Sequence, residues 1–296
     1  MILSVYHSKV INKINRNEAV KMKKIIALLL AVMMVAVCFT SCGENKDNNN
    51  DATSKTEAKA DSDLSYVQGK GKLVVGITDF EPMDYQDESG NWIGFDADMA
   101  KAFGESIGVS VEFTEIDWDN KAMELDGKSI DCVWNGMTLN DEVKSAMSCS
   151  NAYCNNAQVV IVKSADASKY QSAADCKDLK FAVESGSAGQ KAAQANGYQF
   201  TEVKDQATAL MEVKAGTCDA AIIDSLMAAA MVGEGTGYAE LTYTAKLTSE
   251  EYGVGFRKGS DLTEKLNEFF KAAFESGKTA EIAEKYGVQA AIIDQK

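Results

Sequence analysis

From residue 72 onward, short apolar segments alternate with segments of helical pattern, and this alternation restricts the fold more than any other feature. KLVVGIT precedes FDADMAKAFGESIG, VEFTEI precedes NKAMELDG, and in the second half LKFAVE precedes AGQKAAQANG. Strands that alternate with helices predict βαβ units with parallel strands. Two such series predict an α/β chain of two lobes, each a mostly parallel sheet flanked by helices.

The last helical segments indicate how the lobes are divided along the chain. LTEKLNEFFKAAFESG and TAEIAEKYG follow the strand-like YGVGF, which we expect to return to the first lobe. Lobe 1 is therefore predicted to span residues 65–161 plus 253–296, and lobe 2 residues 162–252. Two passages of the chain between the lobes make a hinge.

Residues 1–41 are predicted to be a signal segment. Lys21, Lys23 and Lys24 precede the apolar run IIALLLAVMMVAVCFT, and we expect Met22 to be the true start. The alternative, a membrane helix that stays in place, is less favoured because the run is short for a span of roughly 20 residues.

The segment after this run predicts a lipid anchor. FTSC resembles a lipoprotein signal, in which the chain is cut before Cys42 and its sulfur is lipidated. Residues 42–64 then form the lipidated cysteine and a tether, because residues 43–63 contain no large apolar side chain. We expect the folded part to lie on the extracellular face of the cytoplasmic membrane, which is the periplasmic side if the cell has an outer membrane.

Charge and composition exclude several functions. The net charge of −14 makes nucleic acid and anionic lipid surfaces poor partners. The single histidine, His7, lies in the predicted signal segment, so we expect no imidazole triad, no metal site and no cofactor. The cysteines after Cys42 show no CxxC spacing, and a disulfide between two of them remains open. They are Cys132, Cys149, Cys154, Cys176 and Cys218.

Polar and aromatic residues follow the predicted strands at their carboxyl ends, where open parallel sheets bind ligands. Each of these residues also has a structural interpretation: the aromatic rings can cap the core, and the last acid can be a helix N-cap worth roughly 1 kcal/mol. SGSAG resembles an anion cradle at a helix N-terminus. Their shared position predicts a small-molecule site. The residues are Asp79, Phe80, Asp117, Trp118, Asn135, Gly136, Thr138, Glu184 and Asp224.

The chain resembles the amino-acid-binding proteins of ABC importers, the extracellular solute-binding proteins of family 3. The resemblance covers residues 66–288 and rests on GKLVVGITDFEPMDY, GFDADMAKAFGESIGV, IDWDNKAMELDGKSIDCVWNGMTLNDE, SGSAG, DAAIIDS and YGVGFRKGSDL. It implies a periplasmic-binding-protein-like (type II) fold, two lobes on a two-strand hinge that close over a ligand. It also implies a monomeric, non-enzymatic protein of amino-acid transport that delivers its ligand to an ABC permease in the membrane.

The resemblance also implies roles for single residues. Phe80 and Trp118 match positions that sandwich the ligand side chain, and Asp224 matches the carboxylate that accepts the α-ammonium. Such a charge-assisted bond is about twice as strong as a neutral one. Gly136 and Thr138 match positions that bind the amino and carboxylate groups.

The α-carboxylate has fewer implied partners than in the family. Ala188 matches a backbone N–H donor, but the position of the family's arginine is occupied by Val143. Three explanations are open. The first is that Lys121 supplies the positive charge, because IDWDNKAMEL resembles the cystine- and glutathione-binding branch of the family, which has a lysine there. Alternatively, the N–H groups of Thr138 and Ala188 bind the carboxylate alone, or the ligand is not an ordinary α-amino acid. Arg257, in FRKGS, is a doubtful substitute.

Two further acids bear on the ligand and on competing functions. A carboxylate at Glu184, helped by Asp79, favours a cationic or amide-bearing ligand, although both are equally interpreted as solvated loop acids. The alternative functions are a dehydratase-like enzyme on the same fold, with Glu184 as general acid, and a ligand-sensing binding protein.

Overall fold

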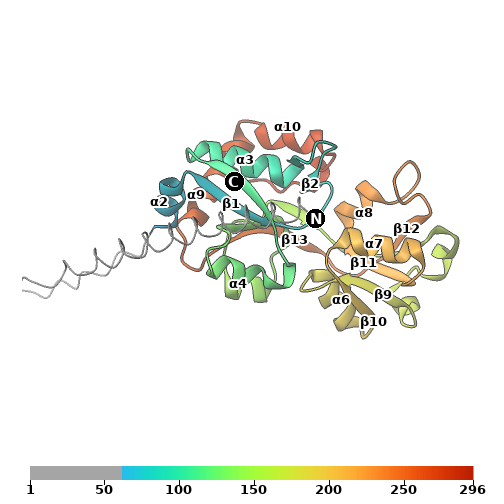
Figure 1. Ribbon diagram of the computed structural model, residues 1–296. Coiled ribbons are helices and arrows are strands. Elements are labelled where there is room, and N and C mark those ends of the chain that lie inside the picture. The colour runs from blue at the N-terminus through green and yellow to red at the C-terminus, as the bar shows by residue number, and fades with distance from the viewer. Residues whose placement is uncertain (1–61, 296) are drawn as a thin grey trace, which may run out of the picture. The chain divides into compact units, whose positions relative to one another are not determined.

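The computed structural model describes residues 62–295, which form two α/β lobes (Figure 1). Lobe 1 contains the sheet of β1 (Lys72–Ile77), and lobe 2 contains the sheet of β9 (Lys180–Glu184). The α/β prediction is thereby confirmed. The predicted signal segment, Cys42 and the tether up to residue 61 lie outside the described residues.

The sheet of lobe 1 has the order β4-β1-β5-β13-β6, and a further strand, β7, pairs with β13. β1 runs parallel to β4 and β5, whereas β13 runs antiparallel to β5, β6 and β7. A small hairpin of β2 (Tyr85–Gln86) and β3 (Trp92–Ile93) stands apart from this sheet. The remaining bounds are β4 (Ser110–Glu115), β5 (Cys132–Thr138), β6 (Ser148–Cys149), β7 (Cys154–Asn156) and β13 (Glu250–Phe256).

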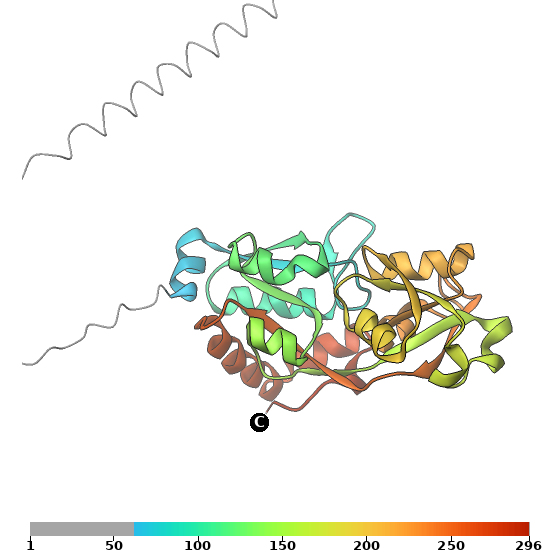
Figure 2. The ribbon, with the colours of Figure 1, turned by 90° about the horizontal axis from the view of Figure 1, so that it is seen from below.

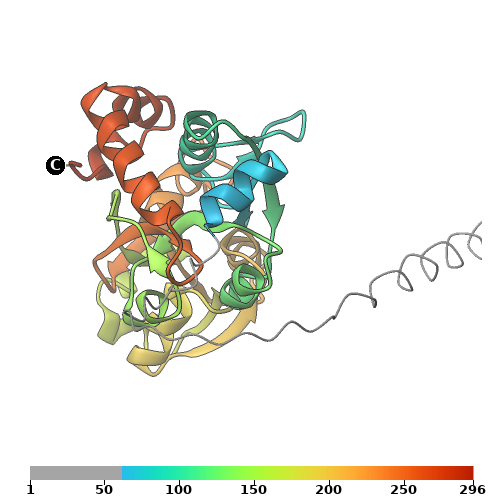
Figure 3. The same ribbon diagram turned by 90° about the vertical axis from the view of Figure 1, so that its left-hand side faces the viewer.

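Helices cover both faces of the lobe 1 sheet, with α3 and α10 on one side and α4 on the other (Figure 1). α3, α9 and α10 pack against one another (Figure 3), and α9 buries one side of each turn, as an amphipathic helix must. The bounds are α2 (Asp63–Lys70), α3 (Phe95–Ser106), η1 (Trp118–Asn120), α4 (Lys121–Asp126), α5 (Asp141–Ala146), α9 (Leu262–Glu275), α10 (Lys278–Lys285) and η4 (Gln289–Ala291).

The sheet of lobe 2 has the order β10-β9-β11-β8-β12. β9 runs parallel to β10 and β11, and β8 runs antiparallel to β11 and β12. β11 is buried along its whole length, as expected for a strand covered on both faces. The bounds are β8 (Gln158–Lys163), η2 (Ser164–Lys169), η3 (Ala173–Cys176), α6 (Ala188–Asn196), β10 (Gln199–Val203), α7 (Gln206–Ala215), β11 (Ala220–Asp224), α8 (Ser225–Met231) and β12 (Leu241–Lys246).

The chain passes between the lobes twice, from β7 to β8 at Ala157 and from β12 to β13 through residues 247–249. The two passages bond to each other, since Leu247 N–H donates to the Gln158 carbonyl (2.8 Å) and Gln158 N–H donates to Thr248 Oγ1 (2.9 Å). They form the predicted two-strand hinge, seen from below in Figure 2. The strands on either side of these passages, β7, β8, β12 and β13, pair antiparallel with their neighbours in the two sheets. The alternation of strands and helices does not predict these antiparallel pairs.

Arg257 is buried at the edge of lobe 1, where it joins three parts of the chain. Its Nε donates to both carboxylate oxygens of Asp63 (3.1 and 3.0 Å), and its guanidinium also donates to the Ile130 carbonyl (2.9 Å) and lies 3.5 Å from Asp131. Lys70 forms a second ion pair with Asp131 (2.5 Å). These bonds hold α2 against the sheet, so Arg257 has a structural role.

The five cysteines of the described residues are free. Cys149 and Cys154 therefore form no disulfide in this structure, and burial raises the pKa of the Cys132 thiol well above its usual value. None of the helices between residues 62 and 295 is long and apolar enough to cross a membrane.

Candidate functional site

Eight of the ten predicted ligand-binding residues line one cavity between the lobes. Lobe 1 contributes the end of β5, α5 and the η1–α4 turn; lobe 2 contributes the β9–α6 loop, the start of α7 and the end of β11. The cavity has a volume of about 30 Å³, enough for roughly one or two waters. An amino acid is larger, so its entry requires the lobes to separate or the lining side chains to move. The eight are Trp118, Lys121, Asn135, Gly136, Thr138, Glu184, Ala188 and Asp224.

Asp224, at the end of β11, is the centre of a network of side-chain hydrogen bonds. Its Oδ1 accepts from the hydroxyl of Tyr252 (2.6 Å), from Gln158 Nε2 (3.0 Å) and from Asn156 Nδ2, and its Oδ2 accepts from Gln206 Nε2. All four donors are neutral, so the described residues give this buried carboxylate no cation. Its geometry suits a ligand ammonium, which would supply the missing charge.

Burial and, second to it, the nearby charge of Glu250 together raise the pKa of Asp224 to about 8. The amides of Asn156 and Gln158 bridge the two acids, because each also donates to Glu250 Oε1 (2.7 and 2.8 Å). These amides and Glu250 belong to the strands that enter and leave the hinge. The hinge is thus bonded directly to the acid of the cavity.

Glu184 is a second buried carboxylate of the cavity, at the end of β9. Its Oε1 is buried without a hydrogen-bond partner among the described residues. Burial raises the pKa of Glu184 to about 8, and the charge of Asp224 adds to the shift. An unpartnered buried acceptor favours a ligand that brings a donor to it.

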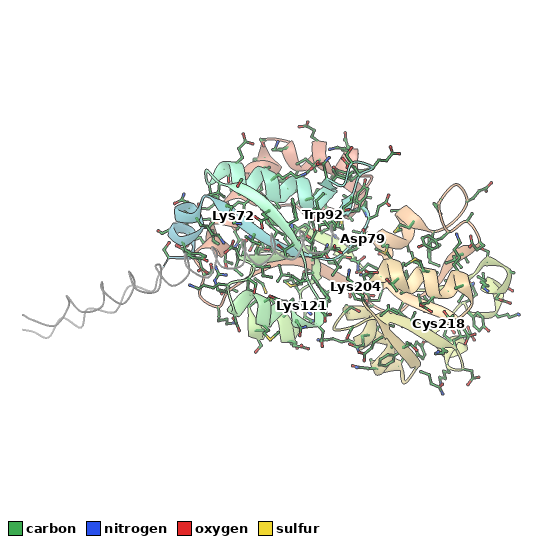
Figure 4. The ribbon with its side chains drawn as sticks, in the orientation of Figure 1. Lys72, Asp79, Trp92, Lys121, Lys204 and Cys218 are labelled. Carbon is green, nitrogen blue, oxygen red and sulfur yellow. The ribbon has the colours of Figure 1, made fainter. Side chains whose placement is uncertain are left out.

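Trp118 and Lys121 lie on the lobe 1 side of the cavity. The ammonium of Lys121 lies 4.9 Å from the ring centroid of Trp118 and donates to the carbonyls of Trp118 (3.0 Å) and Gly186 (3.1 Å). The second bond crosses from lobe 1 to lobe 2, and Figure 4 shows Lys121 and Lys204 at the junction of the lobes, away from Lys72 and Cys218. Burial lowers the pKa of Lys121.

Gly136 and Phe80 are packed together, and Phe80 does not line the cavity. A Cβ on Gly136 would meet Phe80 Cε1 at 2.5 Å, and the φ of +54° also favours glycine. Phe80 is buried against Tyr252 in an edge-to-face contact, with 6.3 Å between ring centroids. The structure therefore brings only Trp118 of the predicted aromatic pair into the lining. The Gly136 N–H points away from a ligand, since it donates to Asp96 Oδ2 (2.7 Å).

Asn135 and Thr138 direct their side chains to protein partners. Asn135 accepts from Thr78 N–H (3.1 Å) and donates to Asp84 Oδ2 (2.8 Å), which fixes the end of β1 against β5. The Thr138 hydroxyl donates to Glu250 Oε1 (3.0 Å). Both residues line the cavity, but these bonds give them a positioning role in this conformation.

The SGSAG turn closes the lobe 2 side of the cavity. Ser187 caps α6 by accepting from Gln190 N–H (3.1 Å), and Gly186 N–H donates to Gln190 Oε1 (2.8 Å). Ala188, the first residue of α6, lines the cavity as predicted. Part of the anion cradle is therefore already occupied by the helix's own glutamine.

Asp79 lies apart from the cavity. It lines a second pocket of about 260 Å³ together with Glu81, Glu115 and Trp92. Burial and the charges of Asp205 and Glu115 raise the pKa of Asp79. The structure thus separates Asp79 from Asp224 and Glu184.

Several lining residues were not predicted. Gln206 follows β10, so it could have been predicted by the same rule as Asp224, that ligands bind at the carboxyl ends of strands. Lys191, which pairs with Glu142 across the lobes, lies within a helix, and no sequence pattern marks it as a lining residue. Asn156 and Gln158, with Asn155, are amides that directly precede the apolar run VVIV, which is a usable signal for a hinge. Val143 lines the cavity, and no arginine of residues 62–295 does.

Two lobes on a two-strand hinge, with an interlobe cavity lined by an aromatic ring and unpaired acids, define the class of the solute-binding proteins. Residues 73–289 match the model of the bacterial extracellular solute-binding proteins, family 3, and the chain belongs to this family. This confirms the predicted family and its periplasmic-binding-protein-like fold.

Named relatives extend over most of the chain. The arginine-binding extracellular protein ArtP of Bacillus subtilis (strain 168) is 27% identical over 271 residues, which cover 90% of this chain and 98% of ArtP. The L-cystine-binding protein TcyJ of Escherichia coli (strain K12) is 27% identical over 227 residues, 75% of this chain and 85% of TcyJ. The crystal structure of AncCDT-1, an ancestral amino acid-binding protein and precursor of cyclohexadienyl dehydratase, superposes with a TM-score of 0.70 at 32% identity, covering 76% of this chain and 99% of that one.

Proposed function

We propose that this protein captures a polar amino acid or a close relative outside the cell and delivers it to an ABC-type amino-acid importer. The observation that carries the proposal is Asp224, a buried acid to which the described part of the chain gives no cation and which shares an interlobe cavity with Trp118. Such an acid suits an ammonium group, and the relatives named for arginine and cystine support an amino-acid-like ligand. No covalent chemistry is needed.

Capture works by a shift between open and closed lobes. In the closed arrangement lobe 1 bonds to lobe 2 through Lys121 and the Gly186 carbonyl, and through the ion pair of Glu142 and Lys191. A ligand that contacts both lobes stabilises this state over the open one. The closed form is then the species that docks on the permease.

Titration of the secreted protein with a panel of amino acids, cystine and small amines tests the proposal. We expect binding of at least one compound by calorimetry, with a change in the fluorescence of Trp118. A W118F variant should lose the fluorescence change while calorimetric binding persists. If calorimetry detects no binding of any compound in the panel, the proposal is contradicted.

We further propose specific roles for the predicted residues. Asp224 receives the ligand ammonium, Glu184 a second donor group, and Trp118 covers the ligand's carbon skeleton. Lys121 closes the lobes over it, and Ala188 N–H remains a donor at the start of α6. The two lobes, each with its own sheet, are proposed to move as separate bodies.

We also propose that the protein is a monomeric lipoprotein whose signal segment is removed and whose Cys42 carries the anchor. The name of the family supports an extracellular position. Metabolic labelling with a radioactive fatty acid tests the anchor: the wild type should be labelled and sediment with membranes. A C42A variant should be unlabelled and released; label that persists in C42A would contradict the proposal.

A dehydratase-like activity is the second candidate, favoured by the likeness to AncCDT-1 and by the raised pKa of the buried Glu184. A carboxyl group that stays protonated near neutral pH is suited to donate a proton. Incubation with a prephenate-like substrate separates the two functions, because a binding protein forms no product. Turnover that disappears in an E184Q variant would establish the enzyme instead.

A further inference from the structure

We infer that the ligand is a small organic dication without a carboxylate, a diamine or a guanidino-amine. The inference rests on the proposed function and names the ligand class of the same cavity. It follows from three observations: the balance of charge around the cavity, the commitment of its hydrogen-bond donors, and the position of its free acceptors.

The charges around the cavity leave a deficit of positive charge. Among the described residues that line it, Glu142 and Lys191 pair with each other. Lys121, whose ammonium acts on Glu184, is then the remaining cation of that lining, beside the two buried acids Glu184 and Asp224. Burial without a cation keeps a proton on Asp224 and on Glu184 near neutral pH, so two cationic groups would let both acids ionise as ion pairs, whereas a zwitterion brings a carboxylate together with its ammonium.

The donors that would hold a carboxylate are already engaged with the protein. Gly136 N–H donates to Asp96, Gly186 N–H to Gln190, and the Thr138 hydroxyl to Glu250. The ammonium of Lys121 donates to two backbone carbonyls.

Val143 adds no side-chain donor to this lining, and the one arginine of the described residues is bonded to Asp63. A ligand carboxylate would then depend on neutral donors such as the Ala188 N–H and the Asn140 amide, without an arginine to replace its hydration shell.

The acceptors, by contrast, are in place for two cationic groups. Among residues 62–295, Asp224 has four neutral donors and no cation, and Glu184 Oε1 is buried without a partner. One amine on Asp224 and one amine or guanidinium on Glu184 would satisfy both acids. Trp118 offers its ring face to the stem or to a cationic end.

Two matched pairs of compounds test the inference, because each pair differs by one carboxylate: cadaverine against lysine, and agmatine against arginine. Calorimetry on the secreted protein should show the amine binding at least roughly tenfold more tightly than its amino acid in one pair. A smaller preference in both pairs, or tighter binding of the amino acids, overturns the inference while the proposed function stands. No binding of any amine or amino acid overturns both.

Substitutions in α5 and β9 provide a second test of the inferred ligand class. V143R places a guanidinium in the cavity and should weaken amine binding at least roughly tenfold, whereas K144R, on the adjacent exposed residue, should not. E184Q should weaken amine binding by a similar factor. Melting temperatures confirm that each variant folds; a folded V143R or E184Q with unchanged amine affinity counts against the inference.

Discussion

At the residue scale, the site depends on Asp224, whose position the sequence predicted from the end of a strand. The rule works because the carboxyl ends of β5, β9 and β11 all open on the same cavity. It could not predict that Phe80 turns beneath Gly136, because that orientation depends on Tyr252, which is distant in sequence and reaches the site from the second hinge passage. Local sequence patterns do not predict contacts between side chains that are so far apart in the chain.

Replacing Asp224 with asparagine removes the charge that an ammonium needs and keeps most of the volume. We expect D224N to weaken ligand binding by roughly 10- to 100-fold, because a hydrogen bond to a charged group is replaced by one to a neutral group. Calorimetry measures the change. D178N, at an exposed position of lobe 2, is the control and should bind like the wild type; equal affinity of D224N would exclude Asp224 from the ligand site.

At the element scale, the turn between β9 and α6 fits closely against η1 of the other lobe. A Cβ on Gly186 would meet Asp119 Cα at 2.6 Å, and that contact exists only when the lobes are together. The alternation of strands and helices predicted β9, α6 and the helix that follows η1, but the contact across the cleft could not be predicted because it depends on how far the lobes close. The antiparallel returns of β8 and β13 escaped prediction for a similar reason, since pairing direction depends on where the chain re-enters a sheet.

G186A should obstruct closure. We expect weaker ligand binding and a larger radius of gyration with ligand, measured by small-angle X-ray scattering. G197A is a matched control, because Gly197 has the same φ of +70° and a Cβ added there would meet no atom within 4 Å. Both variants should lose similar stability, about 1 kcal/mol, from the left-handed backbone. If G186A closes like G197A, the steric argument is wrong.

The attachment of α2 is a second property of elements. R257M leaves Asp63 and the buried Asp131 with fewer partners, so we expect it to reduce the free energy of unfolding by about 3 kcal/mol. Ligand affinity should stay as in the wild type, because Arg257 does not line the cavity. Urea unfolding and calorimetry measure the two quantities. Loss of affinity in a folded R257M would place this arginine in the binding mechanism.

At the scale of the whole molecule, buried acids make stability depend on pH. Burial raises the pKa of Asp224 and Glu184 to about 8 and that of Asp96 to about 7, whereas an unfolded carboxyl titrates near 4. Between pH 5 and 8 the folded protein therefore holds protons that the unfolded chain releases. Stability from these groups is present at low pH and is lost as pH rises through the folded pKa values.

We accordingly expect the ligand-free protein to melt at a lower temperature at pH 8 than at pH 5, by roughly 2–4 °C for each kcal/mol lost. Differential scanning calorimetry across this range measures the slope. D224N should flatten it, because one of the raised groups is gone, and D178N should not. A melting temperature that rises from pH 5 to pH 8 would show that these acids are ionised in the folded state.

The small volume of the interlobe cavity has a consequence for kinetics. A space of about 30 Å³ is too small for a molecule the size of an amino acid, so a bound compound occupies it with the lobes or the lining side chains displaced. Where the lobes must separate for release, the residence time of a bound compound cannot be shorter than the time that the hinge takes to open. Compounds of very different affinity would then share one upper limit on their release rate, set by the opening of the lobes.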